Sequence, residues 1–210
     1  MAIGFSAQLV ASSPGALEAH STFRMKHPWK LEAIEMTILK NISVLGRSAQ
    51  RTEGGIVLGQ IYLRCTFGHA GRRARKREGD GATPIGTWQI VEVLYRADRV
   101  VRPLTALPVR PLKRDSGWCD ATGDRNYNRL VHHPYAASAE RMWRDDPLYD
   151  LVAVLNHNRK PRVQGGGSAI FMHIARAGHL PTEGCIALRE RDLRQVLSRA
   201  SAKTRLHVLA

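Results

Sequence analysis

The chain has 210 residues, with 32 Lys and Arg against 18 Asp and Glu, and its formal net charge is +14. This length suits one domain with a substantial core, and a hydrophobic fraction of 43% excludes a wholly disordered chain. The positive charge favours contact with a polyanion, which is nucleic acid, an acidic membrane surface or an anionic wall polymer; the sign alone does not choose among them.

Residues 1–36 show no clear hydrophobic period, and we interpret them as an N-terminal extension or leader. They lack the basic start of a secretory signal, so a cleavable signal is not expected. No stretch of the chain is long and apolar enough to predict a transmembrane segment. We therefore expect one domain over residues 37–210.

The first strand signals lie at residues 37–45 and 56–65, with a turn signal at Gly54-Gly55 between them. This pair predicts a hairpin whose second strand is kinked at Gly59. Residues 68–86, rich in glycine and charge, predict a long loop.

The rest of the chain predicts further strands, two short helices and much irregular structure. In order these are a strand at 87–95, an irregular segment at 96–135, a helix at 138–145 with Ser138 as N-cap, strands at 149–155 and 168–174, a helix at 192–200 with Asp192 as cap, and a strand at 205–209. About six or seven strands with two short helices favour a mainly β, mostly antiparallel fold of the sandwich or barrel type.

A cysteine and a histidine carry the chemistry that the sequence suggests. His173 lies near the end of a predicted apolar strand, and Cys185 follows Gly184 directly. Thiol acyl transfer needs a thiolate, a base and backbone N–H donors for the oxyanion, and Gly184 allows a close approach of backbone to substrate. The alternative is a buried structural cysteine beside a core histidine, and from composition alone the two interpretations are about equal.

The other two cysteines, Cys65 and Cys119, give the chain an odd number of thiols. At least one thiol is therefore free or pairs with another chain. Cys65 lies in a strand pattern and is interpreted as core, whereas Cys119 has no assigned role. No Cys or His cluster has the spacing of a metal site, so no metal is expected.

The densest positive segment is Arg72–Arg77. Three interpretations stay open: a solvated face, an anchor for anionic wall peptides, or a nucleic-acid contact. The segment lacks the interleaved aromatic residues of a stacking platform, so nucleic acid is not expected as a partner.

Three ordered motifs carry a resemblance to a known family. They are His173 followed by Gly178 and Thr182-Glu183-Gly184-Cys185-Ile186-Ala187-Leu188, the upstream segment 79–88 with Thr83-Pro84-Ile85-Gly86, and the stretches 124–128, 148–150 and 167–171. Together they resemble the L,D-transpeptidase (YkuD-type) catalytic domain, in particular a proteobacterial branch with a TEGC-type nucleophile motif. The resemblance covers roughly residues 37 to 210.

Several positions depart from the pattern of that family. Ile174 and Ala175 follow His173 where the family has Gly-Thr, Ala187 replaces a frequent Arg, and Glu183 replaces a frequent His or Arg. The nucleophile and the base are retained, so the departures concern the substrate contacts.

The resemblance implies that Cys185 attacks the peptide carbonyl before the terminal D-residue, with His173 as its base. It also implies that a backbone carbonyl near His173, which we assign to Ile174, orients the imidazole. Gly184, Thr182 and Ser168 are the candidate oxyanion and substrate contacts, although a loop-to-strand turn explains Ser168 equally well. No cofactor and no metal are implied.

The implied function is a peptidoglycan L,D-transpeptidase that acts on stem peptides in the cell envelope or periplasm. A hydrolase with the same site (a carboxypeptidase, endopeptidase or amidase) and a non-enzymatic basic polyanion-binding protein remain as alternatives. The sequence does not decide the oligomeric state.

Overall fold

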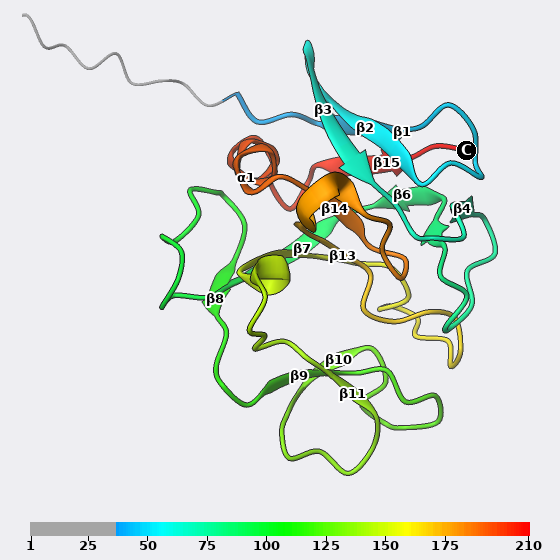
Figure 1. Cartoon of the computed structure of the whole chain (residues 1–210), viewed down its shortest axis with the longest axis vertical. Helices are drawn as coiled ribbons and strands as arrows, with labels where there is room; N and C mark the ends of the chain where they lie inside the picture. The colour runs from blue at the N-terminus through cyan, green and yellow to red at the C-terminus, as the bar shows by residue number, and fades with distance from the viewer. Residues whose placement is uncertain (1–36) are drawn as a thin grey trace, which may run out of the picture. The chain divides into compact units, whose positions relative to one another are not determined.

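The structure is a computed structural model that describes residues 37–210, and one mixed sheet dominates it (Figure 1). The predicted extension over 1–36 lies outside the described residues. The order of the ten strands in this sheet is β6 (Gly86–Trp88), β15 (Arg205–Val208), β1 (Asn41–Leu45), β2 (Glu53–Leu58), β3 (Ile61–Thr66), β14 (Ile186–Leu188), β13 (Phe171–Ile174), β12 (Leu151–Leu155), β7 (Ile90–Tyr95) and β8 (Val109–Pro111). Neighbours are parallel in the pairs β1/β15, β13/β14 and β7/β8 and antiparallel elsewhere.

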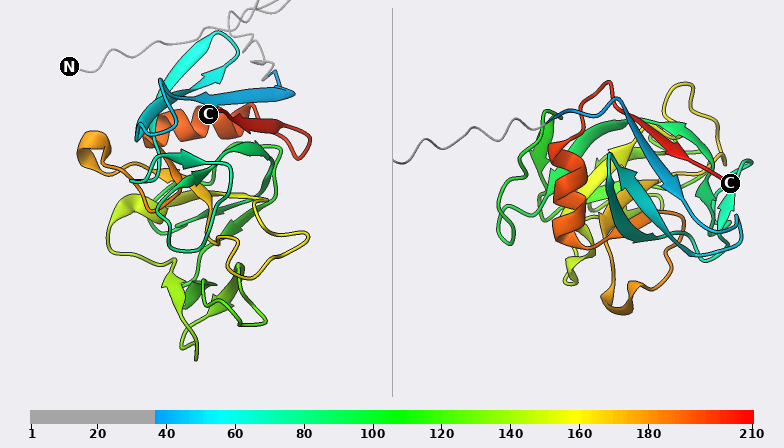
Figure 2. Two further views of the ribbon diagram at one scale, coloured as in Figure 1. Left: turned by 90° about the vertical axis from the view of Figure 1, so that its right-hand side faces the viewer. Right: turned by 90° about the horizontal axis from the view of Figure 1, so that it is seen from above.

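The large sheet curls because its two ends are joined by almost no chain. Strand β6 is one edge and β7 lies beside the other edge, yet Gln89 alone separates these two strands in the sequence. The Gln89 N–H donates to Asn156 Oδ1 at 2.8 Å, and the Asn156 N–H donates to Gln89 O at 2.9 Å. The curl is visible end-on in Figure 2. The predicted mainly β, barrel-like domain is thereby confirmed.

The central strand β12 is buried on both faces, which explains its unbroken apolar sequence. Leu151, Ala153 and Leu155 face the larger core, while Val152 and Val154 face a second, smaller core. Side chains alternate between the two faces of a strand. The neighbouring strands β13 and β14 divide their side chains between the same two faces.

Two small sheets and short helical turns complete the described residues. They are the three-stranded sheet β10 (Arg129–His132), β9 (Ser116–Cys119) and β11 (Ala139–Arg141), the pair β4 (Arg72–Arg73) and β5 (Thr83–Pro84), and the 3-10 turns η1 (Pro147–Tyr149) and η2 (Ala177–His179). The three-stranded sheet lies at the end of the domain opposite the β2–β3 hairpin (Figures 1 and 2). Trp118 of β9 packs edge-on against Phe171 of β13, with ring centroids 5.0 Å apart.

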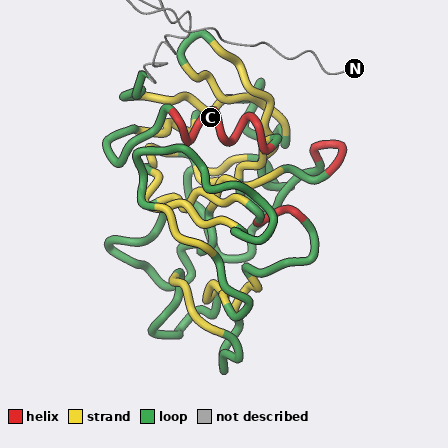
Figure 3. The backbone as a smooth tube through the Cα atoms, turned by 90° about the vertical axis from the view of Figure 1, so that its left-hand side faces the viewer, coloured by secondary structure: helices red, strands yellow, loops and turns green. Residues whose placement is uncertain are grey.

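The helix α1 (Glu190–Ser198) is the one α-helix in the described part of the chain (Figure 3). Leu193, Val196 and Leu197 recur at helical spacing and are fully buried in the larger core. The expected cap at Asp192 is wrong, because the helix begins two residues earlier and its N-cap is Arg189. The Arg189 side chain makes no capping hydrogen bond.

Three other sequence predictions are corrected. Residues 56–65 do not form one kinked strand but a hairpin, since Gly59, at φ +67°, allows β2 to turn into β3. The predicted helix at 138–145, with Ser138 as N-cap, is wrong: strand β11 occupies 139–141 and pairs with β9. The apolar residues of that segment have no sustained helical period, so pairing with β9 prevails. The predicted loop over 68–86 contains the short strands β4 and β5.

No helix within residues 37–210 has the length and apolar character needed to cross a membrane.

Candidate active site

The turn that carries Cys185 requires a glycine before the cysteine. Gly184 has φ +134°, and a Cβ atom there would lie 2.9 Å from Ala82 O. Any other residue would meet both backbone strain and a steric clash. Cys185 therefore lies immediately before β14, in a segment that only glycine allows.

Two threonine hydroxyls hold this turn in place. Thr182 Oγ1 donates to Cys185 O at 2.7 Å and accepts from the Gly184 N–H at 3.1 Å. Thr83 Oγ1 also donates to Cys185 O at 3.3 Å and accepts from the Gly68 N–H at 2.9 Å. Gly184 is a candidate oxyanion contact, but in this structure Thr182 accepts the hydrogen bond of its N–H.

His173 and Cys185 lie on the same face of two adjacent strands. Strands β13 and β14 run parallel, with His173 opposite Ala187 and therefore two residues beyond Cys185 on that face. The His173 ring nitrogen Nδ1 lies 2.9 Å from Ile174 O. A carbonyl oxygen only accepts, so Nδ1 carries the proton and Nε2 keeps its lone pair in the neutral ring.

The Cys185 thiol makes hydrogen bonds to two backbone groups. Its Sγ donates to Ala169 O at 3.1 Å and accepts from the Phe171 N–H at 3.4 Å. Ala169 has φ +52°, an uncommon conformation for a residue with a side chain, and it directs this carbonyl at the thiol. No hydrogen bond joins Cys185 Sγ to His173 in this structure, since the two groups bond to Ala169 O and Ile174 O instead.

Burial keeps both groups neutral. Cys185 is 8% exposed and His173 is 4% exposed. Burial raises the pKa of the Cys185 thiol to about 12, and the negative charge of Glu140 acts in the same direction. Burial lowers the pKa of His173 to about 4, against the opposing effect of its hydrogen bond to Ile174. The resting site thus contains a thiol and an imidazole rather than an ion pair.

Tyr149 of η1 supports the imidazole from the side of the three-stranded sheet. Its ring lies edge-on to His173, with centroids 5.4 Å apart. Its hydroxyl donates to Glu140 Oε1 at 2.6 Å. The contact orients the His173 ring, and the hydrogen bond ties Tyr149 to β11.

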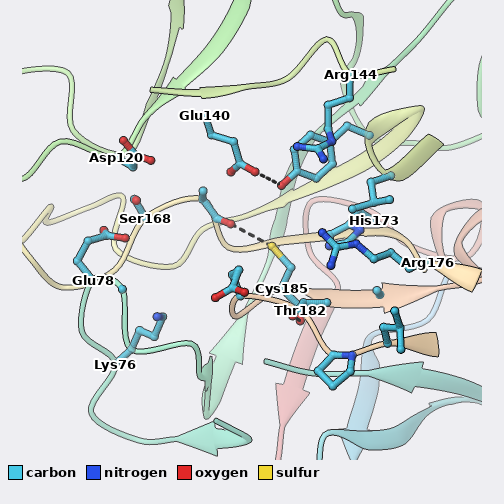
Figure 4. A pocket seen from close by; sticks show the side chains of 18 residues that line it. Lys76, Glu78, Asp120, Glu140, Arg144, Ser168, His173, Arg176, Thr182 and Cys185 are labelled. Carbon is cyan, nitrogen blue, oxygen red and sulfur yellow. Dashed lines mark hydrogen bonds between the residues drawn. The ribbon is translucent and has the colours of Figure 1, made fainter. Parts of the chain in front are cut away.

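Cys185 opens into a cavity of about 410 Å³, shown in Figure 4. Its wall contains charged side chains of both signs, together with Cys185 and His173. The charged residues that line it are Lys76, Glu78, Asp120, Glu140, Arg144, Arg176 and Glu183. Asp120, Glu78 and Ser168 lie on one side of the Cys185 sulfur in Figure 4, and His173 and Arg176 lie on the other.

The six residues predicted from the sequence converge here. Cys185, His173, Thr182 and Ser168 line the cavity, while Gly184 and Ile174 act from behind through their backbones. Sequence reasoning did not identify Glu78, Asp120, Glu140, Arg144 and Arg176 as residues of the cavity wall. No local motif marks these five residues, because they come from loops and strands that only the fold brings together.

The remaining cysteines lie outside the cavity wall. Cys65 belongs to the larger core, and burial raises its pKa to about 12. Cys119 is buried at the end of β9. Neither is among the residues that line the cavity.

The basic segment is not a uniform solvated face. Arg72 is 2% exposed, lies over the Phe67 ring and donates to Ser48 O at 2.7 Å. The Lys76 side chain is 4% exposed and pairs with Asp80. The exposed basic residues of this segment are Arg73, Arg75 and Arg77.

No group of three or more His, Cys, Asp or Glu side chains in residues 37–210 is arranged to hold a metal ion.

Comparison with known proteins identifies one family. Residues 41–208 match the family model of the L,D-transpeptidase catalytic domain (YkuD). No curated protein and no protein of solved structure matches the chain.

Proposed function

Because the chain belongs to the L,D-transpeptidase catalytic-domain family, we propose that it transfers an acyl group between peptidoglycan stem peptides through Cys185. The donor is a tetrapeptide stem that loses its terminal D-amino acid, and the acceptor is the amine of a diamino acid on a neighbouring stem. The observation that supports this best is the cavity in which a buried thiol and an oriented neutral imidazole lie on one face of β13 and β14.

Both groups start neutral, so the first step is base-assisted attack. The thiol rotates from Ala169 O toward His173, whose Nε2 accepts the proton while Sγ bonds to the substrate carbonyl carbon. The negative charge that develops on the carbonyl oxygen needs an N–H donor. The Cys185 N–H is the remaining candidate, since Thr182 accepts from the Gly184 N–H.

Collapse of the tetrahedral intermediate breaks the peptide bond. The His173 imidazolium returns its proton to the departing amine, which leaves a thioester on Cys185. The acceptor amine then attacks this thioester, His173 takes a proton from it, and Cys185 leaves as the thiol. Because His173 protonates the leaving group, the D-amino acid occupies the side of the cavity that holds His173, Arg144 and Arg176.

Arg176 suits the carboxylate of that leaving group. It is exposed at the cavity wall and makes no ion pair within residues 37–210. Arg144, by contrast, holds Asp146 through two hydrogen bonds of 2.7 and 2.6 Å. Since the substrate class lies outside the cytoplasmic membrane, we place the reaction in the cell envelope.

The test is to incubate the purified protein with a disaccharide tetrapeptide that contains diaminopimelate and to identify the products by mass spectrometry. Loss of the terminal D-alanine is expected, together with a cross-linked dimer. Cys185→Ala should abolish both products. Cys65→Ala is the matched control, because it removes a buried thiol outside the cavity.

Free tripeptide without dimer would assign a hydrolase instead of a transferase. Equal behaviour of the native protein and Cys185→Ala would overturn the acyl-transfer proposal and favour the basic polyanion-binding alternative.

A further inference from the structure

One side of the cavity is acidic. Glu78, Asp120 and Glu140 come from the loop after β4, the end of β9 and strand β11, which are distant in the sequence. Ser168, from the segment before β13, lies beside Glu78 and Asp120 in Figure 4. All four line the same cavity as Cys185. We call Glu78, Asp120, Glu140 and Ser168 the acidic subsite.

The three carboxyl groups of the acidic subsite form no direct ion pair in the part of the chain that the structure describes. Glu78 accepts from the Tyr127 hydroxyl and Glu140 from the Tyr149 hydroxyl, and both of those partners are neutral. None of the three carboxyl groups takes part in an ion pair within residues 37–210. Two of the basic side chains that line the same cavity already have carboxylates of their own, since Lys76 pairs with Asp80 and Arg144 with Asp146.

Two buried polar atoms of the acidic subsite make no hydrogen bond of good geometry within residues 37–210. Ser168 is 6% exposed, and its Oγ makes no hydrogen bond within the described residues. Asp120 Oδ1 is buried and equally unsatisfied. Buried polar atoms without a partner cost free energy, and native proteins keep few of them away from functional sites. These two atoms therefore point to a ligand that supplies hydrogen-bond donors.

The charge and the donors together define the ligand. Carboxyl groups without a cation are costly in a buried wall, and burial does raise the pKa of Glu140. A primary ammonium group carries one positive charge and three donors and no acceptor, which complements carboxylates and a hydroxyl. The three carboxyl groups do not form a group that could hold a metal ion within residues 37–210.

We propose that the acidic subsite binds a side-chain ammonium group on the residue whose carbonyl Cys185 attacks. The inference rests on the proposed function and adds to it a specificity device of this chain. The leaving group takes the His173 side, so the acyl-donor residue extends to the opposite side, where Glu78, Asp120 and Ser168 lie. Glu140 lies between the two sides, hydrogen-bonded to the Tyr149 hydroxyl. Glu140 and Asp120 bind the ammonium, and Ser168 accepts its remaining hydrogen.

The experiment compares two donor peptides that differ in one group. One is a tetrapeptide with a free side-chain amine on its third residue, and the other has that amine acetylated. For the native protein, kcat/KM should be roughly 30-fold higher with the free amine, as is usual when one partner of a buried charge pair is lost. The difference should lie mainly in KM, because the ammonium does not take part in bond breaking.

Glu140→Gln and Asp120→Asn should each lower kcat/KM for the free-amine peptide and bring the ratio of the two peptides toward one. If these residues had a merely structural role, the substitutions would lower kcat/KM equally for both peptides and leave the ratio unchanged. Glu53→Gln, which removes a carboxylate of the exposed Arg64 pair, is the control and should keep the native ratio. If Glu140→Gln does not fold, Asp120→Asn still tests the proposal. This substitution removes no hydrogen bond of Asp120 Oδ1 within the described residues.

A native ratio near one, or an unchanged ratio in both variants, overturns the acidic subsite. Failure of the proposed function looks different: neither peptide then gives a Cys185-dependent product. In that case calorimetric titration of both peptides into Cys185→Ala decides. Preference for the free amine supports the subsite without acyl transfer, and equal or absent binding rejects it.

Discussion

Cys185 and His173 are both buried, and burial shifts their pKa values in opposite directions. The pKa of Cys185 rises to about 12 and that of His173 falls to about 4. Each group therefore keeps one protonation state over the whole range between these values. Many reactive cysteines have a lowered pKa, whereas here the imidazole must take the proton during attack.

Activity should consequently be insensitive to pH around neutrality. We expect kcat/KM to stay level down to about pH 5 and to fall by half near the pKa of His173, at about pH 4, since a protonated imidazole cannot accept the thiol proton. A pH–rate profile with the tetrapeptide donor measures this. A fall centred at the ordinary histidine pKa would contradict the neutral thiol–imidazole site.

The same group should affect the stability of the fold. The native pKa of His173 lies below its ordinary value of 6.5, so the unfolded state binds the proton more tightly. The contribution of neutral His173 to the free energy of unfolding is about 3 kcal/mol. It is fully present above pH 6.5 and is lost as the pH falls toward 4. Urea unfolding of the native protein and of His173→Gln at both ends of this range measures the difference. Parallel losses in the two proteins would speak against it.

Thr182 is the second residue whose contacts make a sharp prediction. Thr182→Val removes the donor to Cys185 O and the acceptor of the Gly184 N–H. We expect kcat/KM to fall about 10- to 100-fold from displacement of the nucleophile, with a stability loss of about 1–3 kcal/mol. Thr182→Ser keeps both hydrogen bonds and should retain most activity. Steady-state kinetics and thermal unfolding of the pair provide the measurement.

At the scale of elements, α1 begins without a capping side chain. Arg189 has the extended backbone of an N-cap, yet its side chain is exposed and makes no capping hydrogen bond. Arg189→Asp should stabilise the protein by about 0.5–2 kcal/mol, because the carboxylate accepts from a first-turn N–H and favours the helix dipole. Arg189→Ala tests the loss of the arginine alone. Thermal unfolding should rank Asp above Ala, and an equal rank would reject the capping argument.

Elements with a clear period were predictable, and those defined by distant partners were not. The strand pattern at 149–155 and the apolar spacing in 192–200 predicted β12 and α1 to within two residues at each boundary. The segment at 138–145 failed because β11 exists through its pairing with β9, some twenty residues upstream. Short strands such as β4 and β5 carry no period long enough to detect.

At the scale of the molecule, the candidate site depends on the smaller of two cores. Trp118, Phe171 and Cys185 share that core, whereas Ile56 belongs to the larger one. The three-stranded sheet that holds Trp118 also supplies Glu140 and, at its edge, Asp120. Packing of this sheet on β13 therefore builds one wall of the cavity.

Removal of this contact should separate stability from activity. Trp118→Ala is expected to cost about 3–5 kcal/mol and to raise KM in the remaining folded protein, since the cavity wall loses its support. Ile56→Ala should cost about 2–5 kcal/mol with KM unchanged. Unfolding curves and steady-state kinetics well below the transition measure both. Equal KM values for the two variants would show that the smaller core does not position the wall.

The sequence by itself determined the mainly β class, and it indicated Cys185 and His173 as the candidate pair, with Gly184 beside the cysteine. These depend on local chemistry: side-chain period, residue type and the conformational freedom of glycine. Tertiary structure alone decided that Thr182 occupies the Gly184 N–H and that a set of carboxyl groups faces the cavity. Those contacts join segments far apart in the chain or fix directions of backbone groups, and no local pattern specifies either.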